Sequence, residues 1–283
     1  MSGDRVGLLW RAELAAEIYA HLSCIDVLEV NAEDWLDAPA RTVRALRTLG
    51  TQVPLTLHGV SMGLASVAPV APRRLARMAR LVDAVQPLAW SEHLAFVRGG
   101  GVEIGHLAAP PRTLETVEGC ARNVAAATRV VGAAPMLENV ATLILPPGSR
   151  LDEASWLRQV LAATGADLLL DLHNLHANAV NFGFDAHAAL LSLPPGRIGE
   201  IHLAGGRQVG EASPRLLDDH LHAVPDAVFD LLECVAGHAS RPLTVVLERD
   251  GAYPPFATLI AELERARQAL ARGRLRRDHE HRL

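Results

Sequence analysis

Short apolar runs rich in Val, Leu and Ile alternate along the chain with amphipathic segments of helical period. The runs predict strands at residues 6–10, 26–31, 54–60, 88–96, 134–140, 167–174, 198–205 and 242–250. The amphipathic segments predict helices at residues 12–22, 39–49, 72–86, 113–131, 152–164, 185–193, 223–238 and 256–272. Because each helix carries the chain back to start a new strand in the same direction, this alternation indicates an α/β protein with a parallel sheet.

Nearly every predicted strand ends in a side chain that can bind a metal. These residues are His58, His93, Glu138, Asp171, His202 and Glu248, and Asp218 and His220 lie in a loop between the last two strands. An open doubly wound sheet would place its ligands at one switch point, whereas a barrel gathers all its C-terminal strand ends at one mouth. We therefore expect a single (β/α)8 TIM barrel over residues 1–272, with a metal site at the C-terminal face of the strands. Residues 273–283 form a charged run that we expect to be a frayed C-terminal tail.

The number and type of these side chains predict more than one metal ion. Four imidazoles and four carboxylates packed together require cations, since buried charges must be paired or bound to metal. Mixed nitrogen and oxygen ligands without thiolate suit iron, manganese or zinc. Two or three ions that share a bridging carboxylate fit this count, and Glu138 on the central strand is the candidate bridge. Asn139, Asn174 and Asn178 follow ligand positions closely, as weak ligands, as substrate contacts or as caps of loop backbone.

Composition narrows the class of protein and its partners. The chain has 283 residues, of which 49% are hydrophobic and 21% charged, with a formal net charge of −5. This mildly acidic balance gives no electrostatic reason to expect a nucleic acid partner. No apolar stretch approaches the roughly 20 residues that span a bilayer, and the N-terminus lacks the layout of a signal peptide. We expect a cytoplasmic protein with no membrane contact.

Read in order, the strand ends resemble the multinuclear non-heme iron-dependent oxidases, a family with the TIM-barrel fold of the xylose isomerase-like and endonuclease IV superfamily. The resemblance rests on EVNAEDW at 29–35, LHGVS at 57–61, SEHLA at 91–95, LENV at 137–140, LDLHN at 170–174, NAVNFG at 178–183, EIHLAG at 200–205, DDHLHAVPD at 218–226 and LERD at 247–250. It implies an enzyme that uses O2 and two or three iron ions in mixed Fe(II)/Fe(III) states to modify a ribosomally synthesised peptide, typically at cysteine. It also implies a cysteine-containing precursor peptide as substrate and a small partner protein that binds the leader peptide.

The same order of ligands resembles endonuclease IV, a trinuclear zinc barrel that cleaves DNA at abasic sites. In that broader pattern the first ion is held by His58, His93 and Glu138, the second by Glu138, Asp171, His202 and Glu248, and the third by Asp218, His220 and the Asn174 position. The endonuclease has His where this chain has Asn174, so a weaker third site fits the oxidases better. The expected catalytic residues are Glu138, His93, Asp171, Asn139 and Arg249.

Several positions depart from the oxidase pattern. His173 stands where Asn is usual, as a further ligand or as a space-filling residue, and Gly206 stands where a further His often follows. Glu92, Glu200 and Asp250 are expected to orient neighbouring histidines. The alternative function is a di- or trinuclear zinc or manganese hydrolase or sugar isomerase on the same barrel. A metal-binding barrel that scaffolds a partner without catalysis is the third interpretation.

Overall fold

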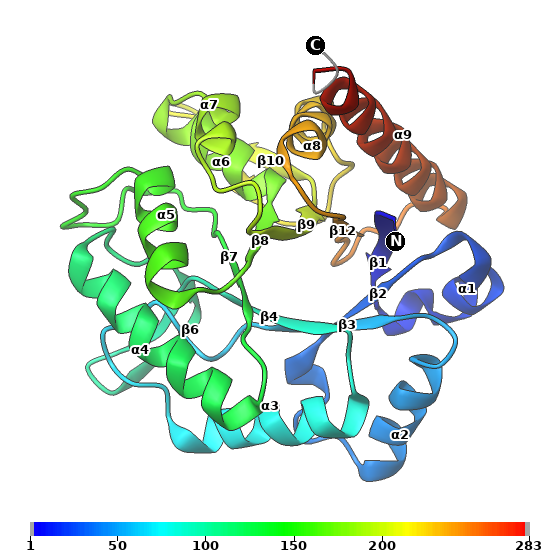
Figure 1. The fold of residues 1–283 in the computed structure, drawn as a ribbon, viewed down its shortest axis with the longest axis horizontal. Coiled ribbons are helices and arrows are strands. Elements are labelled where there is room, and N and C mark those ends of the chain that lie inside the picture. Colours follow the sequence, from blue (N-terminus) through cyan, green and yellow to red (C-terminus); the bar gives the residue numbers. More distant parts are fainter. Residues whose placement is uncertain (1–2, 281–283) are drawn as a thin grey trace. The chain divides into compact units, whose positions relative to one another are not determined.

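Eight parallel strands form a closed barrel, which confirms the predicted fold class (Figure 1). A computed structural model describes residues 3–280 of the chain. The barrel strands are β1 (Arg5–Leu9), β2 (Leu28–Asn31), β3 (Leu55–Gly59), β4 (Ala89–His93), β7 (Met136–Glu138), β8 (Leu168–Asp171), β9 (Ile198–Leu203) and β12 (Thr244–Leu247). They are joined in the order β1-β12-β9-β8-β7-β4-β3-β2. Their apolar residues are almost wholly buried, as expected for strands covered on both faces.

Helices follow the strands as the amphipathic pattern predicts. They are α1 (Ala15–Ala20), α2 (Ala40–Leu49), α3 (Pro72–Val85), α4 (Leu114–Val131), α5 (Glu153–Thr164), α6 (Leu172–Phe182), α7 (Ala186–Leu191), α8 (Asp226–His238) and α9 (Phe256–Glu280), with short 3-10 turns at Ala12–Leu14, Leu22–Cys24 and Ala32–Asp34. Thr113 and Asp152 cap the N-termini of α4 and α5 through their side-chain oxygens. No helix within residues 3–280 combines the length and apolar character needed to cross a membrane.

Helix α6 is the main departure from the predicted elements. The sequence indicated a strand as far as residue 174, but β8 stops at Asp171. The Asp171 side chain accepts a hydrogen bond from the backbone N–H of Asn174 and so starts α6. His173 and Asn174 therefore lie in the first turn of a helix, not at a strand end. Helix α9 continues to Glu280, so the expected tail is helical over 273–280 and its last residues, 281–283, lie outside the described part of the chain.

Two antiparallel hairpins extend from the barrel strands and were not predicted. One joins β5 (Phe96–Gly99) and β6 (Val102–Ala108), and the other joins β10 (Gly206–Val209) and β11 (Arg215–Asp218). In the first, Gly100 and Gly101 make the turn with φ values of +57° and +82°, which glycine adopts without strain. The second hairpin carries Asp218, a predicted ligand, at its last strand residue.

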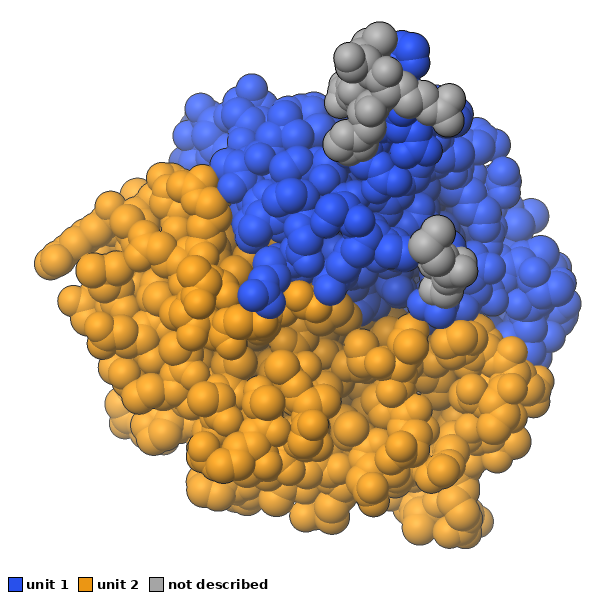
Figure 2. Space-filling view, viewed as in Figure 1, with its two compact units in different colours: residues 1–27, 141–144, 169–283 blue, residues 28–140, 145–168 orange. Residues whose placement is uncertain are grey.

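The chain divides into two compact units (Figure 2). Unit 1 comprises residues 1–27, 141–144 and 169–283, and unit 2 comprises residues 28–140 and 145–168. In unit 1, β12 lies between β1 and β9, and α8 packs against α9. In unit 2, β2, β3, β4 and β7 pair in parallel, with Leu57, Trp90 and Leu137 among the buried side chains. That the whole chain is one domain stays a prediction.

Candidate metal centre

In unit 2, three neighbouring strands bring His58, His93 and Glu138 together. The strands pair so that His93 lies beside Glu138 in the sheet. The Nε2 atoms of His58 and His93 stand 3.2 Å and 3.1 Å from the same oxygen, Oε2 of Glu138. His58 and Glu138 are buried, and the two imidazole rings lie 4.6 Å apart between centroids. The structure thus gathers three of the predicted ligands around one point.

The second ring nitrogen of His58 and of His93, Nδ1, makes a hydrogen bond within the protein. His93 Nδ1 lies 3.1 Å from the Gly59 carbonyl oxygen, which only accepts, so this nitrogen carries the proton. His58 Nδ1 lies 2.7 Å from Ser91 Oγ. The Leu57 carbonyl oxygen, 3.5 Å from Ser91 Oγ, can accept the hydroxyl hydrogen, which leaves Oγ to accept from Nδ1. With Nδ1 as donor in both rings, each Nε2 presents a lone pair toward Glu138.

This arrangement fits a metal ion. Two imidazole lone pairs and a carboxylate oxygen that converge are a donor set for iron, zinc or manganese. Donor atoms bound to one ion at roughly 2.0–2.2 Å stand about 3 to 3.5 Å apart, and the observed separations of 3.1 Å and 3.2 Å match that spacing. The hydrogen bonds to Nδ1 are those that commonly orient a metal-binding histidine.

Two further acids hold the backbone next to this cluster. Glu33 accepts hydrogen bonds from the N–H groups of Val60 and Ser61, directly after β3. Glu92 accepts from the N–H groups of Met62 and His93. Complete burial, together with the charge of Glu33, raises the pKa of Glu92 to about 8. Glu92 therefore holds the backbone at the end of β4 and in the loop after β3, whereas the sequence suggested that it orients a histidine ring.

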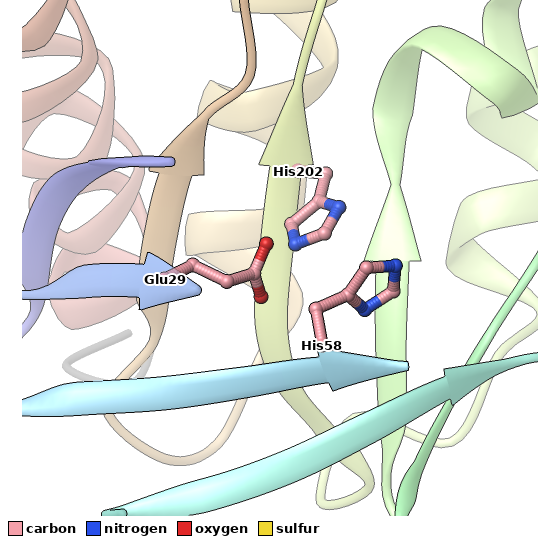
Figure 3. A group of neighbouring side chains, drawn as sticks. All are labelled: Glu29, His58 and His202. Carbon is pink, nitrogen blue, oxygen red and sulfur yellow. The ribbon is translucent and has the colours of Figure 1, made fainter. Parts of the chain in front are cut away.

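Figure 3 shows Glu29 on β2 and His58 on the neighbouring strand β3. A carboxylate oxygen of Glu29 lies within 4.8 Å of a ring nitrogen of His58, and Glu29 is fully buried. Glu29 was not among the predicted ligands because it lies inside its strand, two residues before the strand end. Ser91 and Glu33 were missed for a related reason, since their roles depend on pairing between strands. His202, also drawn in Figure 3, belongs to β9.

In unit 1, the ends of β8, β9 and β12 bring Asp171, His202 and Glu248 together. One ligand atom from each residue lies within 4.8 Å of the others, and all three side chains are buried. His202 Nδ1 is 3.1 Å from Glu248 Oε2. Two buried carboxylates beside one imidazole carry more negative charge than the histidine can neutralise, so this cluster also fits a cation.

A second acid–histidine group in unit 1 contains the other two predicted loop ligands. His220 Nε2 lies 2.9 Å from Asp218 Oδ2, and its Nδ1 lies 3.3 Å from Asp250 Oδ2. The other oxygen of Asp250, Oδ1, pairs with Arg11. His220 has a φ of +54°, a left-handed conformation that is uncommon for a residue other than glycine. The loop holds this conformation and thereby turns the imidazole between the two carboxylates.

The surrounding carboxylates control the protonation of this group. Burial alone would lower the pKa of His220, but the charges of Glu248, Asp218 and Asp250 raise it well above its ordinary value. Burial likewise opposes ionisation of Asp218, yet hydrogen bonds from His173 and His220 hold its pKa at about 2. Asp218 thus stays ionised, and without a bound ion the positive charge between Asp218 and Asp250 is that of the His220 imidazolium.

Four other candidate site residues are three asparagines and one arginine, and their surroundings differ. Asn139 and Asn174 are buried, and Asn139 lines a small pocket with Arg112 and Trp156. Asn178 accepts a hydrogen bond from the Thr142 N–H, so the loop-capping interpretation is confirmed for it. Arg249 is buried, and its guanidinium lies 3.8 Å from Glu262 of α9.

Comparison with known proteins places the whole barrel in one family. Residues 5–271 match the RiPP precursor modification enzymes MbnB/TglH/ChrH. A UPF0276 protein of Bordetella bronchiseptica is 34% identical over 271 residues, covering 95% of this chain and 93% of the relative. A UPF0276 protein of Rhizorhabdus wittichii is 36% identical over 253 residues, covering 89% of each chain.

Solved structures with this architecture include sugar-converting barrels. D-psicose 3-epimerase from Clostridium cellulolyticum superimposes with a TM-score of 0.61 at 13% identity, covering 96% of this chain and 98% of that chain. A xylose isomerase domain protein from Planctomyces limnophilus superimposes with a TM-score of 0.62 at 13% identity, covering 95% and 99%. At this level of identity the likeness concerns the fold alone.

Proposed function

Because the chain belongs to the family of RiPP precursor modification enzymes, we propose that it is a multinuclear non-heme iron-dependent oxidase. Its proposed reaction uses O2 to modify a ribosomally synthesised precursor peptide at cysteine. The observation that carries the proposal is the pair of buried histidine–carboxylate clusters, one at His58, His93 and Glu138 and one at Asp171, His202 and Glu248. Both contain only nitrogen and oxygen donors, which suit iron.

We assign one ion to each cluster and propose that Glu138 is the ligand the two ions share. A third, weaker ion is assigned to Asp218 and His220, with Asn174 as the neutral ligand. Bound iron would bind the substrate thiolate and pass the electrons taken from the substrate to O2. As the family resemblance implies, the proposed cofactor is two or three iron ions in mixed Fe(II)/Fe(III) states, and zinc or manganese in their place is the alternative.

The chain's own residues bind the substrate, orient the ligands and exclude water. Burial of Glu138 and Asp171 keeps bulk water from the carboxylates that would hold the ions. Gly59 and Ser91 keep His93 and His58 in one orientation through Nδ1. Buried Asn139, next to Glu138 in the chain, is proposed to donate its amide N–H to the substrate, and Arg249 to place positive charge beside Glu248.

The substrate is expected to be a cysteine-containing peptide encoded by a short open reading frame beside this gene. We propose that a small partner protein, also encoded nearby, binds the leader segment of that peptide. The experiment combines the iron-reconstituted protein, the partner and the peptide, with and without O2, and follows the peptide by mass spectrometry.

A change in peptide mass that requires O2 and iron, and that is lost when the cysteine is replaced by serine, is the expected result. Glu118→Gln, on the exposed face of α4, serves as the matched active control for Glu138→Gln. Zinc as the bound metal, with no peptide modification after iron reconstitution, would refute the oxidase and favour the hydrolase or sugar isomerase.

A further inference from the structure

His173 is a fully buried histidine in the first turn of α6, beside the Asp218–His220 group. Its Nδ1 lies 2.8 Å from Asp218 Oδ1. Its Nε2 is also buried, and no residue within 3–280 makes a hydrogen bond to it. A proton on Nε2 would be a buried donor without an acceptor, which costs more than a bare lone pair. The proton therefore sits on Nδ1 and is donated to Asp218.

The two oxygens of Asp218 consequently have different partners. Oδ1 accepts from His173, while Oδ2 lies 2.9 Å from His220 Nε2. A carboxylate held at one oxygen cannot rotate about its last bond, so the other oxygen stays directed at His220. In metal sites, a residue that does not bind the ion often fixes the orientation of a ligand in this way. Here His173 is the orienting residue and Asp218 is the ligand.

The β10–β11 hairpin leaves room for this contact. Gly206 lies directly opposite Asp218 in the hairpin register. A Cβ at position 206 would stand 2.1 Å from the Leu217 carbonyl oxygen and 2.6 Å from His173 Cε1. Any side chain there would displace the imidazole, so Gly206 is the residue that allows His173 to reach Asp218.

We propose that His173 is a positioning residue for the ion assigned to Asp218 and His220, and not itself a ligand. The inference rests on the proposed function, because that ion is part of it. His173 holds Asp218 through Nδ1, and its Nε2 lies against Gly206, 3.0 Å from where a Cβ would stand. Loss of the Nδ1 donor should weaken the third ion and leave the other clusters intact.

Three substitutions at this position separate the possible roles. The amide nitrogen of Asn occupies nearly the position of a histidine Nδ1, whereas that of Gln occupies nearly the position of Nε2. Leu has the shape of Asn without a donor. We expect His173→Asn to keep the third ion, and His173→Leu and His173→Gln to bind it about 10- to 100-fold more weakly.

The readout is the iron content per protein after equilibration with graded concentrations of a chelator, together with the Tm of the metal-free variants. Equal retention by the Asn and Leu variants would show a space-filling role, and retention by Gln but not Asn would show an Nε2 ligand; either result overturns the proposal. Asp218→Asn is the reference for loss of the ion, and an unchanged iron content in that variant also overturns it. Because no arm measures peptide oxidation, failure of the proposed oxidase activity is a separate outcome.

Discussion

At the scale of single residues, the direction of each imidazole decides whether a cluster can bind metal. His58 and His93 both use Nδ1 for a hydrogen bond within the protein, and so offer Nε2 to Glu138. Ser91→Ala removes the partner of His58 Nδ1 and frees the ring to rotate or change tautomer. We expect metal at this cluster to bind about 10- to 100-fold more weakly.

The measurement for Ser91→Ala is a chelator competition on the purified protein. Ser192→Ala is a matched control, because Ser192 Oγ also donates to a backbone carbonyl but lies at the end of α7. Ser91→Thr keeps the hydroxyl and should restore most of the affinity. An affinity equal to wild type in Ser91→Ala would show that the hydrogen bond does not orient His58.

Glu138→Gln tests the shared ligand. Gln has nearly the same shape but lacks the negative charge that helps neutralise a bound cation. We expect the variant to lose at least one ion per protein, measured by elemental analysis, while circular dichroism stays that of wild type. Retention of the full metal complement would contradict the bridging role.

The ligands themselves could be predicted at the residue scale, whereas the residues around them could not. His58, His93 and Glu138 end apolar runs, so their shared location follows from barrel geometry. Ser91 and Glu33 act across strands, and His173 acts across a helix and a hairpin. Those contacts depend on strand register and on helix α6, and the hydrophobic periodicity of the sequence predicts neither.

At the scale of elements, Asp171 is both a strand-end ligand and the N-cap of α6. Its Oδ1 accepts the Asn174 N–H at 2.7 Å. Asp171→Asn keeps the cap and removes the charge, whereas Asp171→Ala removes both. In the metal-free protein we expect the Ala variant to be less stable than the Asn variant by about 0.5–2 kcal/mol. Both should lose metal, and equal unfolding midpoints in denaturant would contradict the capping role.

The sequence that follows Asp171 explains why α6 was not predicted. Apolar residues continue past Asp171 at Leu172 and Leu175, which extends the apparent strand. The two hairpins were missed because β5 continues the apolar run of β4 and because β10 and β11 are only half-buried. The barrel strands and most helices were predicted correctly, since their burial gives a strong pattern.

Arg112 and Glu153 join the loop before α4 to the start of α5. Arg112 Nη2 lies 2.7 Å from Glu153 Oε2, and both side chains are about nine-tenths buried. Arg112→Met leaves a buried carboxylate without its cation and should destabilise the protein by about 3–5 kcal/mol. Adding Glu153→Leu should recover most of that loss, measured by urea unfolding. A double variant no more stable than Arg112→Met would show that the pair does not act as a unit.

At the scale of the whole molecule, the buried acids make stability depend on bound metal. Glu138, Asp171 and Glu248 are carboxylates that folding removes from water, and a cation that binds only the folded chain offsets that cost. A ligand at 1,000 times its Kd stabilises the folded state by about 4 kcal/mol. We expect Fe(II) under anaerobic conditions to raise the Tm of the metal-free protein in a concentration-dependent way.

A comparison of metal ions tests whether the histidines take part. Because histidines supply part of each donor set, Zn(II) should act similarly, whereas Ca(II), which prefers oxygen ligands alone, should leave the Tm nearly unchanged. Stabilisation by Ca(II) equal to that by Fe(II) would mean that the ions neutralise acidic charge without binding the histidines, and the assignment of both clusters as iron sites would then fail.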